Sequence, residues 1–421
     1  MYRLIYTLLL SLLMPLILLR LYWRGRSNPA YRQRIAERFG RVATPATSVQ
    51  VWIHAVSVGE TMAARPLIEK LIAEYGEQAV YVSTTTPTGS DTVRRLFADR
   101  VLHGYFPYDL PWLAARYLKR IQPALFISME TEIWPNFWHQ CQRNGIPLML
   151  ANARLSSRST RRYRRVCGFI SSVLNQATLI ACRNAQDKQH FLSLGVQAEK
   201  VKVVGDIKLD IQLQQADKEQ GKQWRAQWGT NRPVLVAAST HQGEDTMLLD
   251  AFATLQKSIP DLLIILVPRH PERFAEVSQL IDNYGYKQQK RSAQQPFAAT
   301  TEVILGDSMG EMMSWYHSAD VVFVGGSLVN TGGHNPLEPL ACQVPVVSGP
   351  HTFNFATLFA QLQQADAIRI AQNQDELVQQ LDELLKNKQL QHEITSKGMQ
   401  IIQQNKGATE RIMQFVIEVI K

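Results

Sequence analysis

The chain has 421 residues, of which 45% are hydrophobic and 19% are charged, and this composition excludes a disordered chain. The length is enough for two domains of ordinary size. Four cysteines without a Cys-x-x-Cys pair argue against a zinc site or a disulfide framework, and a formal charge of +9 favours anionic partners.

An apolar segment at the start of the sequence predicts a membrane anchor. Leu4–Leu19 carries no charge, and the residues after it are rich in arginine. A full span needs about 20 apolar residues, and Arg20 can lengthen this one by reaching the interface. Because arginine-rich flanks stay in the cytoplasm, we expect an uncleaved anchor over 1–26 and a cytoplasmic body. A cleaved signal peptide and an ordinary core helix are the alternatives.

Two series of short apolar runs alternate with helical patterns along the rest of the chain. The first series covers 51–58, 79–86, 124–130, 147–153 and 178–182, and the second covers 234–240, 262–268, 302–307, 320–327 and 344–349. Such alternation is typical of parallel sheets with helices on both faces. We predict an α/β protein with two Rossmann-like domains facing across a cleft.

The polar stretch 212–232 separates the two series and is interpreted as the connection between the domains. The domain boundaries that follow are 27–207 for the first domain and 208–421 for the second. Ligands of parallel sheets bind beyond the carboxyl ends of the strands, so the chemistry should be sought in the residues that follow the apolar runs.

Acidic and basic candidates follow the runs of the first domain. Glu60 comes after a glycine at the start of a helix, where it can cap the helix or act as a general base. Glu130 and Glu132 follow a later run and have the same alternative as helix-start acids. Lys208 lies near the domain junction, and taken alone it is best interpreted as a surface lysine paired with a neighbouring aspartate.

Phosphate and ribose candidates follow the runs of the second domain. Arg269 comes directly after an apolar run, and a guanidinium there suits a phosphate. The loop 306–312 leads into a helix whose first amides can bind phosphate. In 332–339, two glycines allow close backbone approach, and Glu338 either accepts ribose hydroxyls or starts a helix. The chain has no Asp-x-Asp pair, so a metal–diphosphate clamp is not supported.

A stretch without acids carries six arginines at 154–165, and four of them recur at helical spacing: Arg158, Arg161, Arg162 and Arg165. An apolar stripe continues at the same period to Leu174. We predict a helix whose basic first half faces anionic lipid, with a merely solvated basic face as the alternative. Nucleic acid is a weaker candidate partner, because no aromatic residues are interleaved with these arginines.

Several motifs give the chain a close resemblance to the 3-deoxy-D-manno-octulosonic acid (Kdo) transferases of Gram-negative bacteria, which attach Kdo to a lipid A precursor. The matching strings are HAVSVGE (54–60), TPTGS (86–90), METEIWPN (129–136), ANARLSSRS (151–159), STHQGE (239–244), LVPRHPERF (266–274), GDSMGE (306–311) and GGHNPLEP (332–339). They span nearly the whole chain.

The resemblance implies a GT-B fold, a CMP-Kdo donor and inverting transfer to the lipid A precursor lipid IVA, without a metal or another cofactor. It implies that Glu60 is the proton acceptor and that Glu130 and Lys208 stabilise the transition state. It assigns the CMP site to Pro268, Arg269, Met309, Gly310, Glu311, Asn335, Pro336, Leu337 and Glu338. It also places the protein at the cytoplasmic side of the inner membrane, against an anionic membrane surface and without nucleic acid.

Two other classes of protein share parts of this pattern. A nucleotide-sugar epimerase can have the same paired domains, but that class does not explain the anchor or the basic helix. A membrane-tethered nucleotide-binding module without activity is the third interpretation. Incubation with CMP-Kdo and lipid A precursor separates the three, because only the transferase gives a Kdo-bearing lipid together with CMP.

Overall fold

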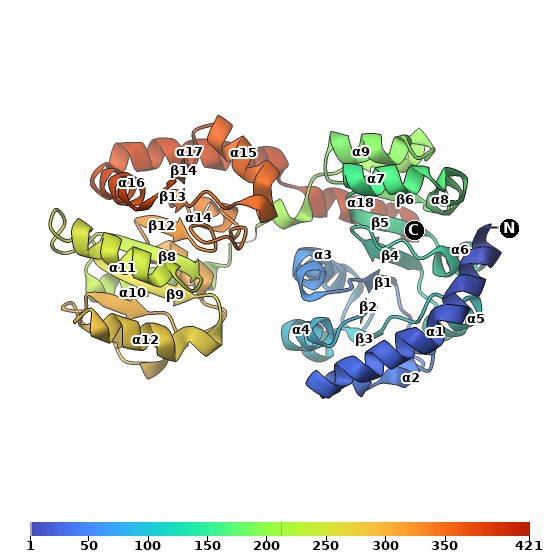
Figure 1. Ribbon diagram of the computed structural model, residues 1–421. Helices are drawn as coiled ribbons and strands as arrows, with labels where there is room; N and C mark the ends of the chain where they lie inside the picture. Colours follow the sequence, from blue (N-terminus) through green and yellow to red (C-terminus); the bar gives the residue numbers. More distant parts are fainter. Residues whose placement is uncertain (1, 212) are drawn as a thin grey trace. The chain divides into compact units, whose positions relative to one another are not determined.

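The structure is a computed structural model that describes residues 2–211 and 213–421. Met1 and Gln212, which the sequence analysis placed in the anchor and in the connection, lie outside the described residues. The chain divides into two compact units (Figure 1). The first unit contains Met1–Asp210 and Asn405–Lys421, and the second contains Ile211–Gln404. The chain after Gln404 thus packs with the first unit, whereas the sequence analysis assigned all of 208–421 to the second domain.

The first unit is built on a parallel sheet with the strand order β3-β2-β1-β4-β5-β6-β7. Side chains alternate across it, so that Trp52 enters one core while Val51 and Ile53 enter the core on the opposite face. The strands are β1 (Val51–His54), β2 (Val80–Thr84), β3 (Leu102–Tyr105), β4 (Leu125–Met129), β5 (Leu148–Ala153), β6 (Leu179–Cys182) and β7 (Val201–Val203).

Helices cover both faces of this sheet. The core around Trp52 is closed by α5 (Pro111–Ile121), α6 (Pro135–Arg143), α8 (Cys167–Leu174) and α9 (Ala185–Leu192). The opposite core is closed by α3 (Val58–Tyr75), α4 (Pro87–Phe97) and α18 (Ala408–Ile420). A proline begins α4, α5 and α6, where its fixed φ suits the first helical turn and its missing N–H costs nothing. Short helical segments complete the unit: α2 (Ile35–Arg38), η1 (Pro29–Arg32), η2 (Ala98–Arg100), η3 (Ala198–Lys200) and η4 (Ile207–Leu209).

The C-terminal helix α18 is an integral part of the first unit. Its Ile412 and Val416 are fully buried in the core that α3 and α4 also line. The carboxylate of Asp210 accepts hydrogen bonds from the backbone amides of Gly407 (2.6 Å) and Thr409 (2.5 Å) at the start of this helix. Asp210 therefore caps the helix from a distant part of the sequence, and the two segments that join the units leave the first unit side by side.

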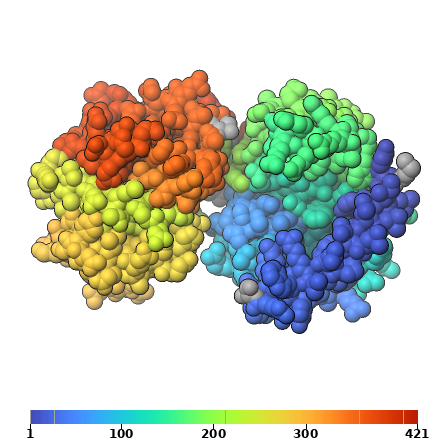
Figure 2. Space-filling model, viewed as in Figure 1, coloured from blue at the N-terminus to red at the C-terminus, as the bar shows by residue number. Residues whose placement is uncertain are grey.

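The apolar N-terminal segment forms one helix, α1 (Tyr2–Ser27), which includes Pro15 and runs along the surface of the first unit (Figures 1 and 2). Among the described residues it is the one helix long and apolar enough to cross a membrane. The side chain of Met14 is buried against α5, whereas much of the helix remains exposed. Most of the exposed apolar side chains are leucines, namely Leu4, Leu8, Leu9, Leu12, Leu13, Leu16 and Leu19.

A buried carboxylate connects α1 to the sheet-covering helices. Asp109 accepts hydrogen bonds from the Tyr6 hydroxyl of α1 (2.9 Å) and from the amides of Asn136 (3.1 Å) and Phe137 (2.7 Å) in the first turn of α6. Burial raises the pKa of Asp109 to about 6, although the amides and the hydroxyl oppose the rise. One side chain thus caps α6 and positions α1.

The arginine-rich stretch forms two helices rather than the single one predicted. Ser157–Arg164 is α7, and α8 starts at Cys167. The break falls at Val166, which is β-branched and lies two residues before Gly168, and both residue types are poor helix formers. The four arginines at helical spacing nevertheless line one hollow of about 400 Å³.

The second unit has a second parallel sheet, in the order β10-β11-β9-β8-β12-β13-β14. Its strands are β8 (Val234–Thr240), β9 (Leu263–Pro268), β10 (Gln288–Lys290), β11 (Val303–Leu305), β12 (Val321–Val324), β13 (Val346–Ser348) and β14 (Arg369–Ile370). One core contains α11 (Glu244–Leu255), α12 (Phe274–Asn283) and α16 (Gln374–Lys386). The remaining helices are α13 (Met312–Ser318), α14 (Leu337–Ala341), α15 (Ala356–Gln364), α17 (Lys388–Asn405), η5 (Pro271–Arg273), η6 (Arg291–Ala293) and η7 (Phe353–Phe355).

The polar stretch interpreted as the connection is mostly a helix of the second unit, α10 (Gln215–Trp228). Its buried Trp224 stacks on Trp315 of α13 with ring centroids 3.9 Å apart. The sequence analysis missed this helix because its polar residues far outnumber the few that anchor it. Large aromatic side chains supply that anchorage, since each buries a large area.

Candidate functional site

Glu60 lies in the first turn of α3, directly beyond the carboxyl end of β1. Its Oε2 accepts a hydrogen bond from the backbone amide of Val56 (2.8 Å), which orients the carboxylate toward the turn that precedes the helix. Burial raises the pKa of Glu60 to about 7; the amide of Val56 and the charge of Lys208 oppose this shift, and the charges of Glu132 and Glu130 add to it. A carboxyl group with this pKa is half ionised near neutrality, which suits a general base.

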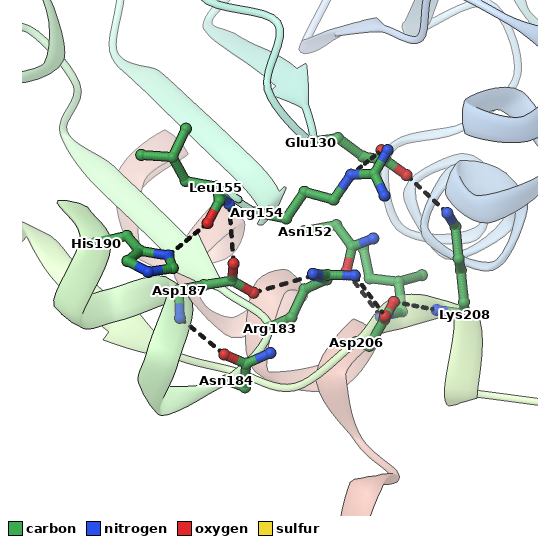
Figure 3. A network of polar contacts seen from close by, with 11 residues as sticks. Glu130, Asn152, Arg154, Leu155, Arg183, Asn184, Asp187, His190, Asp206 and Lys208 are labelled. Atoms are coloured by element: carbon green, nitrogen blue, oxygen red, sulfur yellow. Dashed lines mark hydrogen bonds and ion pairs between the residues drawn. The ribbon is translucent and has the colours of Figure 1, made fainter. Parts of the chain in front are cut away.

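Glu130 follows β4 and holds two cations. Its backbone has a φ of 52°, in the left-handed region that a non-glycine residue rarely adopts. The side chain is almost fully buried, and its two oxygens accept from Lys208 Nζ (2.8 Å) and Arg154 Nε (2.7 Å) (Figure 3). A buried carboxylate between two basic groups keeps both cations in fixed positions. Strained backbone of this kind is typical of functional sites.

The backbone that carries Lys208 is fixed by side chains from the neighbouring strands (Figure 3). Asn152 Oδ1 accepts from the amide of Ile207 (3.1 Å), and Asp206 Oδ1 accepts from the amide of Lys208 (3.0 Å). Asp206 is also paired with Arg183 (3.4 Å). The interpretation of Lys208, from its local sequence, as a surface lysine paired with a neighbouring aspartate is therefore wrong. Its ammonium group binds Glu130 instead.

Glu132 is a third carboxyl group in the same cluster. Burial raises its pKa to about 7, and the charge of Glu130 adds to the shift. Within this cluster, Glu130 and Glu132 disfavour the ionisation of Glu60, whereas the charge of Lys208 favours it. The first unit thus brings together Glu60, Glu130 and Glu132, as their positions after the strands predict, and adds Lys208, whose place in the cluster was not predicted from strand position.

The second unit places Pro268 and Arg269 at the carboxyl end of β9. The Arg269 amide donates to the carbonyl of Thr240 at the end of β8 (3.0 Å), so the two strand ends are tied together. The Arg269 side chain is exposed at this edge of the sheet. It is therefore accessible to an anionic ligand.

Met309, Gly310 and Glu311 follow β11, which is the neighbour of β9 in the sheet. Gly310 has a φ of 90°, which a residue with a side chain adopts only with strain. The Glu311 carboxylate is occupied by the guanidinium of Arg291, with a shortest distance of 2.7 Å. This loop therefore offers a ligand its backbone amides rather than the side chain of Glu311.

Asn335, Pro336, Leu337 and Glu338 form the loop that enters α14. Asn335 Oδ1 accepts from the amide of Leu337 (3.1 Å), and its Nδ2 donates to Glu338 Oε1 (3.4 Å). Burial raises the pKa of Glu338, and Asn335 and Arg269 oppose that shift. His334, in the same loop, is hydrogen-bonded to His241 at the end of β8, to which the β9 loop is also tied, so the two loops lie close together.

Three histidines near these loops were part of the matching strings but were not assigned a role: His241, His270 and His334. The rings of His241 and His334 stack with centroids 5.2 Å apart, and His270 meets His241 edge-on. Each follows a strand end or a glycine pair, and that placement was the available signal. Arg154 was likewise counted only among the basic residues. Within the described residues, no group of three or more His, Cys, Asp or Glu side chains is arranged to hold a metal ion.

Comparison with known proteins relates both units to glycosyltransferases. A family model described as 3-deoxy-D-manno-octulosonic-acid transferase matches residues 33–211, and one described as glycosyl transferases group 1 matches 236–400. A 3-deoxy-D-manno-octulosonic acid transferase of Haemophilus influenzae is 40% identical over 99% of this chain and 98% of its own length. The corresponding transferase of Bordetella pertussis is 37% identical over 83% of this chain and 84% of its own length.

Solved structures with low sequence identity show the fold alone. An Anabaena protein in complex with UDP and glucose matches 88% of this chain and 100% of its own with a TM-score of 0.53 and 16% identity. A UDP-GlcNAc 2-epimerase from Neisseria meningitidis has the same coverage, with a TM-score of 0.59 and 12% identity. The predicted GT-B fold class is confirmed. The 40% identity to the Haemophilus enzyme over nearly the full length shows that the chain belongs to the family of 3-deoxy-D-manno-octulosonic acid transferases and is a glycosyltransferase.

Proposed function

We propose that the enzyme transfers Kdo from CMP-Kdo to the lipid A precursor lipid IVA, with inversion and without a metal, and that Glu60 is the general base. The observation that carries the proposal is the carboxyl cluster of the first unit. Glu60 has a pKa of about 7 there and lies within electrostatic reach of the Glu130–Lys208 pair. A base of this strength can accept a proton from a sugar hydroxyl as the hydroxyl becomes a nucleophile.

The proposed reaction forms two bonds, one between the acceptor oxygen and Kdo and one between the proton and Glu60, and breaks two. The acceptor oxygen bonds to the anomeric carbon of Kdo and loses its proton to Glu60. The bond between that carbon and the phosphate oxygen breaks, and CMP leaves with the electron pair. Glu130 and Lys208 stabilise the charges of the oxocarbenium-like transition state. Lys208 suits this role because Glu130 keeps its ammonium group in place.

Donor binding is assigned to the strand-end loops of the second unit. Arg269 would contact the phosphate, the amides around Gly310 would add hydrogen bonds, and Glu338 would accept from the ribose hydroxyls. Pro268, Met309, Glu311, Asn335, Pro336 and Leu337 would shape the same CMP site. The support for this assignment is that a hydrogen bond joins Arg269 to the end of β8, and another joins His241, at that same strand end, to His334 in the loop before α14.

The lipid acceptor accounts for the apolar helix and the basic hollow of the first unit. We propose attachment to the cytoplasmic side of an inner membrane through α1, whose exposed leucines suit lipid. The four arginines of the α7 hollow would face anionic head groups. The exposure of these leucines supports membrane contact.

The test of the proposed base is Glu60→Gln. This change preserves the shape of the side chain and removes its ability to accept a proton. We expect transfer from CMP-Kdo to lipid IVA to fall by about 100-fold or more, because general base catalysis typically contributes that much. Product lipid is measured by mass spectrometry, and CMP binding is measured separately by calorimetry.

The matched control is Glu74→Gln, an exposed position on the same helix. It should keep full activity, and the CMP affinity of both variants should equal that of the unchanged enzyme. A Glu60→Gln enzyme that transfers Kdo at the normal rate would exclude Glu60 as the base. Equal loss of transfer and of CMP binding would assign Glu60 a structural role instead.

A further inference from the structure

Two histidines in the second unit share a hydrogen bond between their ring nitrogens. Nε2 of His241 and Nε2 of His334 are 2.9 Å apart. One of the two nitrogens must carry a proton and the other must accept it, so the pair shares a single proton in this direction. His241 follows β8 and His334 precedes α14, and the two belong to loops that are 93 positions apart.

The backbone around His241 is arranged to direct its side chain. The register of β8 with β9 shifts between Ala238 and Thr240, and Ser239 has a φ of 56°. A bulge at the end of a strand turns the following side chain in a new direction, and the strained φ of Ser239 persists only where the surroundings enforce it. The strained backbone at the end of β8 thus lowers stability locally and fixes the position of His241.

A buried carboxylate fixes the His241 loop against the loop after β12. Glu244 accepts hydrogen bonds from the amide of His241 (2.9 Å) and from those of Gly326 (2.6 Å), Ser327 (2.9 Å) and Leu328 (2.9 Å). With four donors its charge is compensated, so Glu244 organises the loops rather than serving as a ligand.

The other histidine is held by close packing. A Cβ added to Gly326 would lie 3.2 Å from Nε2 of His334, and one added to Gly332 would lie 2.5 Å from the Asn354 side chain. Glycine is therefore needed beside the His334 ring, at Gly326, and in the His334 loop, at Gly332, and both glycines have positive φ. Two separate sets of constraints thus place the two rings in contact.

The pair lies among cationic groups. Burial lowers the pKa of His334 to about 4, and Arg269, His241 and His270 lower it further. Burial also lowers the pKa of His241, and His270, Arg269 and Arg273 act in the same direction while Glu244 opposes them. Arg273 is already paired with Asp245 (2.5 Å), and Glu338 lies in the first turn of α14, which follows the His334 loop. Without a ligand the two imidazoles are therefore neutral at pH 7.

We infer that the His241–His334 pair binds the phosphate of the donor nucleotide and takes up a proton when it does so. A phosphate beside the pair would add negative charge to a group of mostly cationic neighbours, and this favours the protonated form. His334 and Glu338 lie within one short segment, so the segment would hold the phosphate and the ribose of one nucleotide. The inference rests on the proposed function, since it names the subsite for the donor phosphate.

The test is calorimetric binding of CMP and of cytidine in two phosphate-free buffers of different ionisation enthalpy near pH 7. We expect CMP binding by the unchanged enzyme to take up a fraction of a proton, seen as a buffer-dependent enthalpy, and cytidine binding to take up none. His241→Gln and His334→Gln should each weaken CMP binding about 10- to 100-fold, the worth of a charge-assisted hydrogen bond, and reduce the uptake. Cytidine affinity should stay the same.

The control variant is His392→Gln, an exposed histidine of α17 that should change nothing. The inference is overturned if the unchanged enzyme binds CMP without proton uptake, or if both histidine variants bind CMP normally. Free Kdo supplies the sugar carboxylate without phosphate; loss of its binding in the variants, with CMP binding kept, would assign the pair to the carboxylate and also overturn the inference. An enzyme that binds neither CMP nor cytidine contradicts the proposed function itself. The buffer comparison needs no variant, so it stands even if a substitution prevents folding.

Discussion

Glu60, Glu130 and Glu132 are three acids in one small region of the first unit, but they have different surroundings. Glu130 accepts from Lys208 and Arg154, so its charge is compensated. Burial dominates at Glu60 and at Glu132, and raises the pKa of each to about 7. Environments that separate otherwise equivalent acids assign them to different tasks. Here Glu130 keeps Lys208 and Arg154 in place, and Glu60 can accept a proton.

The raised pKa of Glu60 predicts the pH dependence of transfer. Glu60 must be ionised to accept a proton, so kcat/KM should rise with pH to a plateau, with its midpoint at about 7. An ordinary glutamate would already be ionised at pH 6 and would give a flat profile above about that pH. Initial rates with CMP-Kdo and lipid IVA across this range measure the midpoint.

Glu132→Gln tests whether that midpoint belongs to Glu60. The charge of Glu132 raises the pKa of Glu60, so its removal should move the midpoint to lower pH. A midpoint that stays in place, or moves upward, would mean that another group controls the profile.

Single residues show where sequence reasoning succeeded and where it stopped. The position of Glu60 after the first strand was sufficient to place it at the sheet edge, because parallel strands end on the same side. The partner of Lys208 could not be found in this way. Glu130 lies 78 positions away, and only the folded unit brings the residue after β4 and the ammonium group of Lys208 in η4 together. Burial of Glu60 likewise depends on neighbours that are remote in the sequence.

The helix α1 has two faces with different chemistry. The inner face carries Tyr6, which donates to Asp109, and the buried Met14. The outer face exposes leucines, among them Leu12 with 75% of its surface accessible. Polar groups that bond to the protein surface would lose their partners if the helix moved alone into hydrocarbon. The observed packing therefore favours a helix that lies at the membrane surface with its outer face in lipid.

Separate substitutions on the two faces test this arrangement. Replacing Leu8, Leu12 and Leu16 together by Gln should abolish most flotation with lipid vesicles and leave the thermal stability of the protein unchanged. Met14→Ala should instead lower stability by about 2 kcal/mol and leave vesicle binding largely intact. Flotation and scanning fluorimetry measure the two effects. A large loss of stability in the triple variant would show that the outer face packs on protein.

The strands that sequence analysis missed are the edges of the sheets. The apolar runs predicted all ten inner strands, but β3, β7, β10 and β14 were not predicted. Their sequences, LHGY, VKV, QQK and RI, are short and partly polar. An edge strand is paired on one side only, so it needs less apolar surface and carries a weaker signal. Inner strands are buried on both faces and read as continuous apolar runs.

At the scale of the whole molecule, the first unit depends on residues from both ends of the chain. Ile412 of α18 is fully buried against the helices that follow β1 and β2. Ile412→Ala should destabilise the first unit by about 2–5 kcal/mol, whereas Gln414→Ala on the exposed side of α18 should be nearly neutral. Hydrogen exchange of the backbone amides, measured region by region, shows which unit loses stability.

The expected pattern is faster exchange in α3 and α4 of the first unit for the Ile412 variant, with α11 and α12 of the second unit unchanged. Local opening of a cooperative unit should raise exchange throughout that unit. Loss of protection in the second unit alone would show that α18 stabilises that unit, as the predicted boundary of 208–421 implies.

The capping of α18 by Asp210 has a consequence for the order in which the protein can be made. A ribosome synthesises the sheet of the first unit early, but the helix that seals one of its faces emerges only after the entire second unit has been translated. Until then an apolar surface of the nascent polypeptide stays uncovered, and chaperones or the nearby bilayer have time to engage it. Folding of the first unit is thus completed only when the last helix has been synthesised and Asp210 can bind the amides at the start of α18.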